Sequence, residues 1–325
     1  MAGIRRAAVL GRPIAHSLSP VIHNAGYAAA GLTGWSYTAI ECAEAELPDR
    51  VAGLGPEWAG LSLTMPLKEA ALGVAAEVSP VAAAVGAANT LVRRPDGSWS
   101  ADNTDVSGMV DVLTGAGVVP GAEVVVLGAG GTARAVLAAA VRLRSSRVTF
   151  RVRRRAAGEE LARLAQALGV RCEIRDWADR GDPGDADVVI STVPRGAADG
   201  LAGAARSWRP ETVVFDVVYD PWPTPLAAGA VAAGCRIVSG LDLLLAQAVG
   251  QFELFTGATA PVPAMRAALA AARTGSCTDG SARPRSGRRG SRPGQDTVDA
   301  ERCRWPSPHG GAGVSAGRDG AGGPG

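Results

Sequence analysis

The feature that most constrains the fold of this chain is a run of valines that breaks on glycines and continues as a helical pattern. The run covers residues 124–144 and reads VVVLGAGGTARAVLAAAVRLR. Within it, Gly128, Gly130 and Ala133 match the spacing G-x-G-x-x-G/A. In that motif a buried strand leads through a tight turn into a helix, whose first backbone N–H groups can bind a pyrophosphate. A nucleotide-binding turn is favoured, and an ordinary strand–loop–helix unit is the alternative.

Length and composition favour an α/β protein of about two domains. The chain has 325 residues, of which 47% are hydrophobic and only 4% aromatic, so small side chains can let helices pack closely on sheets. A formal net charge of +2 gives no reason to expect a nucleic-acid partner. The five scattered cysteines include no C-x-x-C pair, which argues against a disulfide framework or a metal site. We expect a cytoplasmic protein without a signal peptide or a membrane span.

Polar side chains follow several predicted strands at the point where each strand ends. Strands are expected over residues 7–10, 35–41 and 59–63, followed by a hairpin that turns at Asp96 and Gly97. The polar groups at the strand ends are His16, Ser17, Ser19, Thr64, Lys68, Asn89 and Asp105. Because ligands of open α/β sheets bind at the carboxyl ends of strands, we expect four of these loop ends, at Ser17, Thr64, Asn89 and Asp105, to converge on one pocket. The alternative is that Ser19 only caps a helix and that His16 and His23 are structural histidines.

Lys68 is a candidate proton donor. Ser19 and Pro20 predict a helix over residues 20–30 with Ser19 as its N-cap. Pro66 predicts another helix start, which would put Lys68 in a first turn. A lysine is electrostatically unfavourable at the positive end of a helix, so this position just after a buried strand indicates a function in proton transfer. A solvated surface lysine is the alternative.

The second strand of the glycine unit and the residues after it predict the cofactor. NAD-binding units hold the ribose 2′-hydroxyl with an acidic residue about 20 residues past the glycines. Residues 124–158 contain no Asp or Glu, and Arg151, Arg153, Arg154 and Arg155 occupy the equivalent place. Guanidinium groups bind phosphate in a bidentate fork. The sequence therefore favours NADP, and a solvated basic turn is the alternative.

The remaining pattern completes two α/β domains and a tail. We expect strands over residues 147–152, 186–191, 212–219 and 235–238, and a helix over 240–257. Gln247 lies in that apolar helix as either a core amide or a group facing a cleft. We predict a substrate-binding, mixed α/β domain from residues 1–105 and 241–273 and a Rossmann-like, doubly wound NADP-binding domain from 106–240. Residues 274–325 are rich in Gly, Arg, Ser and Pro, and we expect them to be disordered and not to bind nucleic acid.

Seven short motifs in this order make the chain resemble the shikimate dehydrogenase family. They are GRPIAHSLSPVIHN (11–24), LTMPLK (63–68), GAANTL (86–91), DNTD (102–105), LGAGGTAR (127–134), YDPWPTPL (219–226) and the helix that carries Gln247. The resemblance covers about residues 7–273. It implies a reversible, NADP-linked reduction of 3-dehydroshikimate to shikimate in aromatic amino acid biosynthesis, by an enzyme that is a monomer or a homodimer.

The resemblance also implies roles for individual residues. Lys68 would be the catalytic acid/base, with Asp105 beside it. Ser17, Ser19 and Tyr219 would bind the substrate carboxylate, and Thr64, Asn89, Asp105 and Gln247 would bind the ring hydroxyls. The cofactor would contact Gly128, Ala129, Gly130, Gly131, Thr132 and Ala133 through its pyrophosphate, Arg151 and Arg155 through its 2′-phosphate, and Val217 and Gly240 through its nicotinamide. No metal is implied.

The sequence departs from the family pattern at three places and leaves two other functions open. One departure is the tail over residues 274–325, which has no counterpart in the family pattern. Phe150 and Val152 replace the Asn and Thr of the adenosine motif Asn-Arg-Thr-x-x-Arg, and Asp242 stands in Gly-Leu-Asp-Leu where Gly-Leu-Gly-Met is usual. The change at Asp242 would alter the nicotinamide surroundings. A quinate or dual quinate/shikimate dehydrogenase is an alternative, although Ser19, where quinate enzymes carry a threonine, favours shikimate. A non-catalytic, shikimate-binding regulatory paralogue would be expected to lack Lys68 or Asp105.

Overall fold

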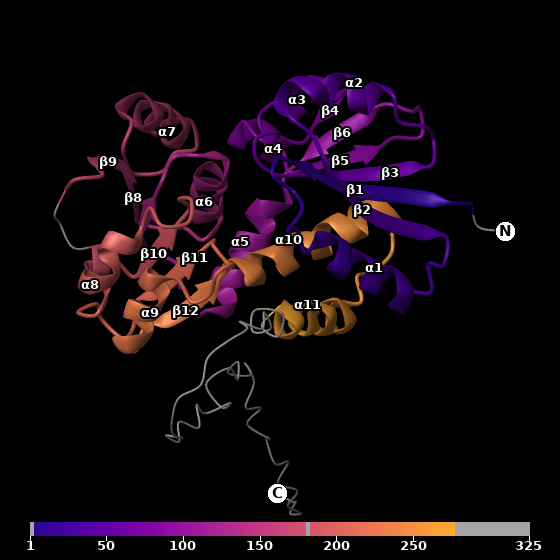
Figure 1. Cartoon of the computed structure of the whole chain (residues 1–325). Helices are drawn as coiled ribbons and strands as arrows, with labels where there is room; N and C mark the ends of the chain where they lie inside the picture. The colour runs from indigo at the N-terminus through magenta and orange to yellow at the C-terminus, as the bar shows by residue number, and fades with distance from the viewer. Residues whose placement is uncertain (1–2, 180–182, 277–325) are drawn as a thin grey trace, which may run out of the picture. The chain divides into compact units, whose positions relative to one another are not determined.

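Two six-stranded sheets with helices on both faces form the described part of the chain, as Figure 1 shows. The structure is a computed structural model that describes residues 3–179 and 183–276, with the backbone alone for residues 274–276. The predicted α/β class is confirmed. The segment predicted to be disordered begins inside the last helix, α11 (Val262–Ser276), and its residues 277–325 lie outside the described part.

The first sheet is mixed and has the strand order β2-β1-β3-β5-β6-β4. Its strands are β1 (Arg5–Gly11), β2 (Trp35–Glu41), β3 (Trp58–Leu63), β4 (Glu77–Val78), β5 (Thr90–Arg93) and β6 (Trp99–Asp102). β1 pairs in parallel with β2 and β3, whereas β5 and β6 form the predicted antiparallel hairpin. Gly97 has a φ of +84° in its turn, a backbone conformation that glycine adopts without steric strain.

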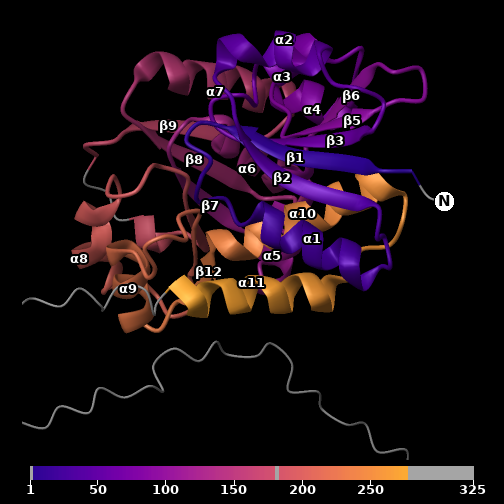
Figure 2. The ribbon, with the colours of Figure 1, turned by 45° about the vertical axis from the view of Figure 1, so that its right-hand side comes forward.

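Helices cover both faces of this sheet, as the views in Figures 1 and 2 agree. One face carries α1 (Ser19–Ala29), α10 (Gly240–Thr256) and α11, and the other carries α2 (Leu47–Ala52), α3 (Ala71–Val74) and α4 (Pro80–Val85). Along β1, Ala7 and Val9 point into the first core, while Ala8 and Leu10 point into the second. A strand buried on both faces in this way reads as a continuous apolar run, which is how residues 7–10 appear in the sequence.

The second sheet is entirely parallel and has the order β12-β11-β10-β7-β8-β9. Its strands are β7 (Glu123–Leu127), β8 (Arg147–Val152), β9 (Cys172–Asp176), β10 (Val188–Ser191), β11 (Val213–Asp216) and β12 (Arg236–Ser239). From β7 the chain adds β8 and β9 on one side and then returns to add β10, β11 and β12 on the other side. That reversal is the topological switch point at which doubly wound sheets bind ligands.

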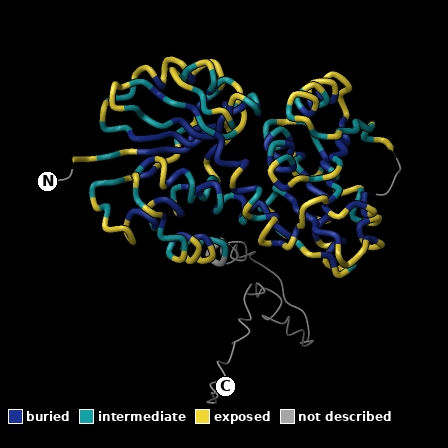
Figure 3. Tube along the Cα trace, turned by 180° about the vertical axis from the view of Figure 1, so that it is seen from behind, coloured by how far each residue is buried: buried dark blue, intermediate teal, exposed yellow. Residues whose placement is uncertain are grey.

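Helices on both faces of the second sheet complete two separate cores. One core joins the sheet to α5 (Thr104–Gly115), α6 (Gly131–Arg142) and α7 (Arg155–Ala167), and the other joins it to α8 (Ala202–Ala205) and α9 (Pro225–Ala232). Strand residues divide by their alternation, so that Val188 and Ile190 face the first core and Val189 faces the second. Figure 3 shows the buried strands inside each sheet and exposed residues on the outer helices.

Two predicted helix starts are wrong. The N-cap of α1 is Leu18 rather than Ser19, and Ser19 is the first helical residue. Residues 65–70 form turns, and α3 begins only at Ala71. Lys68 therefore lies in a turn after β3 and not in the first turn of a helix, because one proline marks a favourable helix start but cannot supply the i→i−4 bonds that continue a helix.

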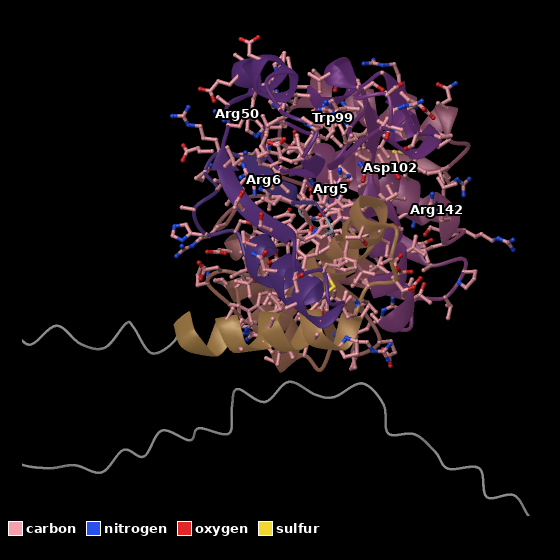
Figure 4. The ribbon with its side chains drawn as sticks, turned by 90° about the vertical axis from the view of Figure 1, so that its right-hand side faces the viewer. Arg5, Arg6, Arg50, Trp99, Asp102 and Arg142 are labelled. Carbon is pink, nitrogen blue, oxygen red and sulfur yellow. The ribbon has the colours of Figure 1, made fainter. Side chains whose placement is uncertain are left out.

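Most charged side chains of the described residues lie at the surface, and Asp105, Arg151 and Asp216 are buried. Figure 4 shows exposed Arg50 and Arg142 at the periphery, whereas Trp99 is buried under the first sheet's helices. In residues 3–179 and 183–276, no helix has both the length and the apolar character that a bilayer crossing requires.

Candidate active site

A cavity of about 330 Å³ lies where the strand ends of the first sheet meet the start of α10 and the glycine turn. All eight residues predicted to be catalytic or to bind substrate line it: Ser17, Ser19, Thr64, Lys68, Asn89, Asp105, Tyr219 and Gln247. Three of the predicted cofactor residues, Thr132, Val217 and Gly240, line the same cavity. The structure thus brings together groups that are up to 230 positions apart in the chain, from Ser17 to Gln247.

Lys68 and Asp105 form an ion pair in the cavity. Lys68 Nζ lies 2.6 Å from Asp105 Oδ2, and their side chains are 19% and 7% exposed. Asp105 is in the first turn of α5, where the helix dipole favours a carboxylate. The Asn103 side chain caps that helix by accepting the Asp105 N–H at 3.1 Å. The pair therefore combines an ammonium donor on a long side chain with a carboxylate held by a helix end.

Lys68 is also the only lysine in the chain. The sequence has 33 Lys and Arg residues, so the other 32 are arginines. Arginine stays protonated at any pH that proteins tolerate, whereas a lysine can release its proton. A chain that uses arginine at every other basic position thus has its single lysine inside the cavity, and this count is a sequence signal for Lys68 that motif spacing does not give.

Asn89 holds Asp105 from the other side. Its Nδ2 donates to Asp105 Oδ1 at 2.8 Å, while its Oδ1 accepts the backbone N–H of Thr104 at 2.8 Å. The same amide nitrogen lies 3.4 Å from Gln247 Oε1, and Gln247 donates to the Leu244 carbonyl at 2.9 Å. Both carboxylate oxygens of Asp105 therefore accept a hydrogen bond from a side chain, which orients the carboxylate toward Lys68.

Hydroxyl groups from two parts of the chain also line the cavity. Ser19 is only 3% exposed, and Ser17 Oγ accepts the Ser19 backbone N–H at 3.3 Å. Tyr219 reaches the cavity from the loop after β11, and burial raises the pKa of its phenol. Tyr219 is consequently a neutral hydroxyl donor near pH 7. Three hydroxyls in the lining suit a carboxylate ligand, because each can donate a hydrogen bond to it.

The glycine turn leaves space at the N-terminus of α6. Gly128 has a φ of +114°, and a Cβ there would lie 2.6 Å from Thr192 Oγ1, so only glycine fits. A Cβ on Gly130 would meet nothing within 4 Å, whereas one on Gly131 would lie 3.7 Å from Lys68 Cδ. Ala133 is fully buried where α6 packs on the sheet. The turn that also contains Ala129 and Thr132 therefore offers an open helix N-terminus beside Lys68, which fits a pyrophosphate.

The two arginines predicted to bind a 2′-phosphate occupy different environments. Arg151, at the end of β8, is 4% exposed and donates to the Asp179 carbonyl at 3.3 Å. Arg155 begins α7 with a side chain that is 93% exposed and pairs with Glu159 at 3.1 Å. The two guanidinium groups contact different partners, and their joint action on one phosphate stays a prediction.

The start of α10 shows what Gly240 and Asp242 do. A Cβ on Gly240 would overlap the Val217 carbonyl oxygen, so this close approach requires glycine. Asp242 Oδ2 accepts the backbone N–H and the hydroxyl of Ser239, each at 2.9 Å, and thereby caps the helix. Leu243, and not Asp242, lines the cavity. The acidic replacement is explained by helix capping.

Sequence reasoning missed two buried polar residues that line the cavity, Ser62 on β3 and Gln251 on α10. Ser62 donates to Gln251 Oε1 at 2.6 Å and accepts the Tyr37 hydroxyl at 2.6 Å. Gln251 lies four residues after Gln247, so both amides share one face of the helix. That spacing was the available signal.

The two histidines near the first loop differ. His23 is fully buried, its Nδ1 lies 3.0 Å from the Ser19 carbonyl, and its ring stacks on Tyr37 at 4.0 Å. Burial lowers the pKa of His23 to about 4. His23 is thus a structural histidine, as the alternative interpretation holds, whereas His16 is exposed and lines the cavity.

Comparison with known proteins gives matches along most of the chain. Residues 9–91 match the family model of the shikimate dehydrogenase substrate binding domain, and residues 240–270 match that of the shikimate 5′-dehydrogenase C-terminal domain. A shikimate dehydrogenase (NADP(+)) of Oleidesulfovibrio alaskensis is 38% identical over 277 residues, which are 83% of this chain and 96% of the relative.

Solved structures match equally broadly. The crystal structure of Mycobacterium tuberculosis shikimate dehydrogenase is 46% identical and has a TM-score of 0.76, with coverage of 82% of this chain and 99% of that one. The Thermus thermophilus shikimate 5-dehydrogenase, solved in complex with NADP(H) and shikimate, is 31% identical and has a TM-score of 0.72. That comparison covers 83% of this chain and all of the other.

Proposed function

Because the chain belongs to the shikimate dehydrogenase family and is an NADP-dependent oxidoreductase, we propose that it catalyses the reversible reduction of 3-dehydroshikimate to shikimate. The reaction would serve aromatic amino acid biosynthesis. The observation that carries the proposal is the pair of Lys68 and Asp105 in the cavity, with the only lysine of the chain placed beside the open glycine turn.

Lys68 is assigned the proton transfer at the ring ketone. Bound NADPH would supply the hydride. As negative charge develops on the ketone oxygen, the Lys68 ammonium stabilises it and donates a proton, and in the reverse direction the amine accepts the proton. Asp105 keeps the ammonium in place through the 2.6 Å contact. The orientation of Asp105 depends in turn on Asn89.

Polar side chains of the cavity orient the substrate ring. We assign Ser17, Ser19 and Tyr219 to the carboxylate and Thr64, Asn89, Asp105 and Gln247 to the ring hydroxyls. All seven side chains line the cavity and together offer hydroxyl, amide and carboxylate groups to a ligand. Fixing both ends of a rigid ring holds the reacting carbon at one place, which is a large part of catalysis between two bound reactants.

The NADP site is assigned to the glycine turn and its neighbours. Gly128, Ala129, Gly130, Gly131, Thr132 and Ala133 would hold the pyrophosphate, Arg151 and Arg155 the 2′-phosphate, and Val217 and Gly240 the nicotinamide. The open space over Gly130 and the parallel sheet with its switch point at β7 support this assignment.

We propose the corresponding division into domains. Residues 1–105 and 241–273 would form the substrate-binding domain, and residues 106–240 the NADP-binding domain. The division is supported by the strands, since the first sheet uses residues 5–102 and the second uses residues 123–239. α10 packs on β3 and β5 of the first sheet and also on α5, so these two helices connect the two domains.

A comparison of shikimate with quinate tests the substrate assignment. Quinate carries an additional hydroxyl on the carbon that bears the carboxylate, next to the buried Ser19. We expect oxidation of shikimate with NADP⁺ to have a kcat/KM above that of quinate. Faster turnover of quinate would replace the assignment by a quinate or dual dehydrogenase, and binding of shikimate without turnover would indicate a regulatory protein.

A further inference from the structure

A chain of buried hydrogen bonds runs beneath the cavity and starts at Tyr37. The Tyr37 hydroxyl donates to Ser62 Oγ at 2.6 Å, and the Ser62 hydroxyl donates to Gln251 Oε1 at 2.6 Å. Gln251 Nε2 then donates to Thr90 Oγ1 and to the Asn89 carbonyl oxygen, both at 3.1 Å. Each of these side chains is buried, and Gln251 is only 1% exposed.

The chain continues to the catalytic pair. The Thr90 hydroxyl donates to Asn89 Oδ1 at 2.8 Å, and Asn89 Nδ2 donates to Asp105 Oδ1 at 2.8 Å. Asp105 Oδ2 accepts the Lys68 ammonium at 2.6 Å. Every link from Tyr37 onward therefore donates in the same direction, toward the carboxylate of Asp105.

Two backbone groups fix that direction. The carbonyl oxygen of Asn89 has no hydrogen, so the Gln251 amide must face it with its NH₂ group and must face Ser62 with its oxygen. The Thr104 backbone N–H can only donate, so Asn89 must face it with Oδ1 and present its NH₂ group to Asp105. A hydroxyl carries one hydrogen, so Ser62 directs its hydrogen at Gln251 Oε1. Thr90 directs its hydrogen at Asn89 Oδ1, which at 2.8 Å is nearer than the other acceptor, Thr104 Oγ1, at 3.5 Å.

We propose that Gln251 is a positioning residue: its amide sets the direction of the hydrogen-bond chain, and through Thr90 and Asn89 it holds the Asp105 carboxylate toward Lys68. The inference rests on the proposed function, since it concerns the same proton transfer. An acceptor in place of the Gln251 NH₂ group would face the lone pairs of Thr90 and of the Asn89 carbonyl. Thr90 would then turn its hydrogen away from Asn89. Asn89 Oδ1 would keep the Thr104 N–H but lose the Thr90 hydroxyl as its second donor, which weakens the hold on the amide that donates to Asp105.

The substitution Gln251→Glu has a distinctive expected pH dependence. The carboxylate that it introduces cannot donate, but the protonated acid can donate from its hydroxyl and accept with its carbonyl oxygen, as the amide does. We therefore expect kcat of the variant, relative to wild type, to be at least about tenfold lower at pH 8 and to recover as the pH falls toward 5.5. Gln251→Met removes both functions and should lose kcat by a similar factor without recovery.

Other ionisable groups surround Gln251 and are shared by variant and wild type. Tyr37 on β2 and His23 on α1 lie at one end of the chain, and Asp105 and Lys68 lie at the other. On α10 itself, Asp242 is bonded to Ser239 and Glu253 accepts the Ala260 N–H; from α11, Arg266 lies near Asp242, and Tyr27 of α1 packs on Phe252. Taking the ratio of variant to wild-type kcat at each pH cancels their common contributions.

The control is Gln166→Glu, which makes the same chemical change at an exposed position of α7. Its kcat ratio to wild type should be unchanged from pH 5.5 to 8. Thermal unfolding of each variant is measured at the same pH values. It gives the fraction of enzyme that is folded, and kcat is calculated per folded enzyme.

The outcomes separate the inference from the proposed function. Recovery of the Gln251→Glu ratio at low pH, without recovery in Gln251→Met, supports the positioning role. A Gln251→Glu ratio that does not change with pH, or a wild-type kcat in folded Gln251→Met, overturns the positioning role. In either case, NADPH oxidation by the wild type with 3-dehydroshikimate leaves the proposed function in place. If the wild type itself does not oxidise NADPH with 3-dehydroshikimate, the proposed function is overturned, and the positioning role with it.

Discussion

Among single residues, Lys68 is the one on which the proposed chemistry depends most, because its ammonium can donate a proton inside the cavity. Replacing Lys68 by alanine should lower kcat about 10²- to 10⁴-fold with a smaller effect on KM. Lys68→Arg should also be impaired, because the guanidinium keeps the charge but does not release its proton. Steady-state rates of NADPH oxidation with 3-dehydroshikimate measure both effects.

The matched control for the lysine variants is Arg142→Lys at the exposed end of α6, which makes the reverse exchange away from the cavity. This variant should turn over like the wild type. A wild-type kcat for Lys68→Arg would show that Lys68 supplies charge only, and a wild-type kcat for Lys68→Ala would remove it from the mechanism.

His23 should make the folded state sensitive to acid. Its pKa is lowered by burial to about 4 in the folded chain, from a value of 6.5 when exposed. As the pH falls from about 6.5 to 4, the unfolded chain takes up a proton that the folded chain does not, so the free energy of unfolding decreases in that window. The shift corresponds to about 3 kcal/mol, all of it lost by about pH 4.

Denaturant unfolding as a function of pH tests the role of His23. In His23→Leu the decrease between pH 6.5 and 4 should shrink by that amount, whereas His16→Leu, an exposed histidine of the preceding loop, should leave it as it is. An unchanged acid dependence in His23→Leu would mean that other groups cause it.

The polar residues at strand ends could be predicted from the sequence, but the buried residues of the hydrogen-bond chain beneath the cavity could not. Thr64, Asn89 and Asp105 follow strand-like segments directly, so their convergence follows from parallel-strand geometry. Tyr37 and Ser62 lie on β2 and β3, which are separated by β1 in the sheet. Their contact depends on strand order and register, which a local sequence pattern does not contain.

Among the secondary-structure elements, the glycine turn allows a test in which one substitution should preserve or raise thermal stability but weaken NADPH binding. Gly130 is the N-cap of α6, a position at which aspartate is favourable, and a side chain there meets no atom within 4 Å. Gly130→Asp should therefore keep or raise the thermal midpoint. It should weaken NADPH binding at least about tenfold, because a carboxylate would face the pyrophosphate.

NADPH titration and thermal unfolding of the same samples check this prediction. The control is Gly203→Asp in α8, where an added side chain also meets nothing within 4 Å. The control should bind NADPH like the wild type. Tight NADPH binding by Gly130→Asp would place the pyrophosphate elsewhere.

The loop between β11 and α9 depends on one threonine. Thr224 caps α9 by accepting the Ala227 N–H at 3.1 Å and donates to the buried carboxyl of Asp216 at 2.8 Å. Asp216 also accepts the Val218 N–H, so it holds the loop that presents Val217 to the cavity. Thr224→Val should lower the free energy of unfolding by about 1–2 kcal/mol.

Urea unfolding of Thr224→Val measures this loss, and Thr38→Val on the exposed side of β2 is the control. We also expect a higher KM for NADPH, because the loop loses its anchor. Equal stability of the two variants would show that the cap and the Asp216 contact contribute nothing.

Helices and strands with a long hydrophobic pattern could be predicted from the sequence. A helix start that was inferred from a single proline could not. The strand β8 and the helix α10 appear within one residue of their predicted ends. The helix expected at Pro66 does not form until Ala71, and the turns between them place Lys68 next to Asp105. A tertiary ion pair of this kind overrides the local preference for a helix start.

At the scale of the whole molecule, the sequence predicted two α/β sheets because apolar strand runs alternate with helical patterns along most of the chain. The order of the parallel sheet follows from right-handed crossovers on either side of β7. The mixed order of the first sheet, with β5 and β6 between β3 and β4, did not follow from the pattern, since antiparallel pairing after a hairpin fixes only neighbours.

We propose that the folded chain uses NADPH to reduce a ring ketone, with Lys68 as the proton donor. The most direct measurement is the initial rate of NADPH oxidation by the purified chain with 3-dehydroshikimate, repeated with NADH and with Lys68→Ala. We predict a rate that saturates with 3-dehydroshikimate, is slower with NADH and is almost lost in Lys68→Ala. No NADPH oxidation by the wild type, or an undiminished rate in Lys68→Ala, would contradict it.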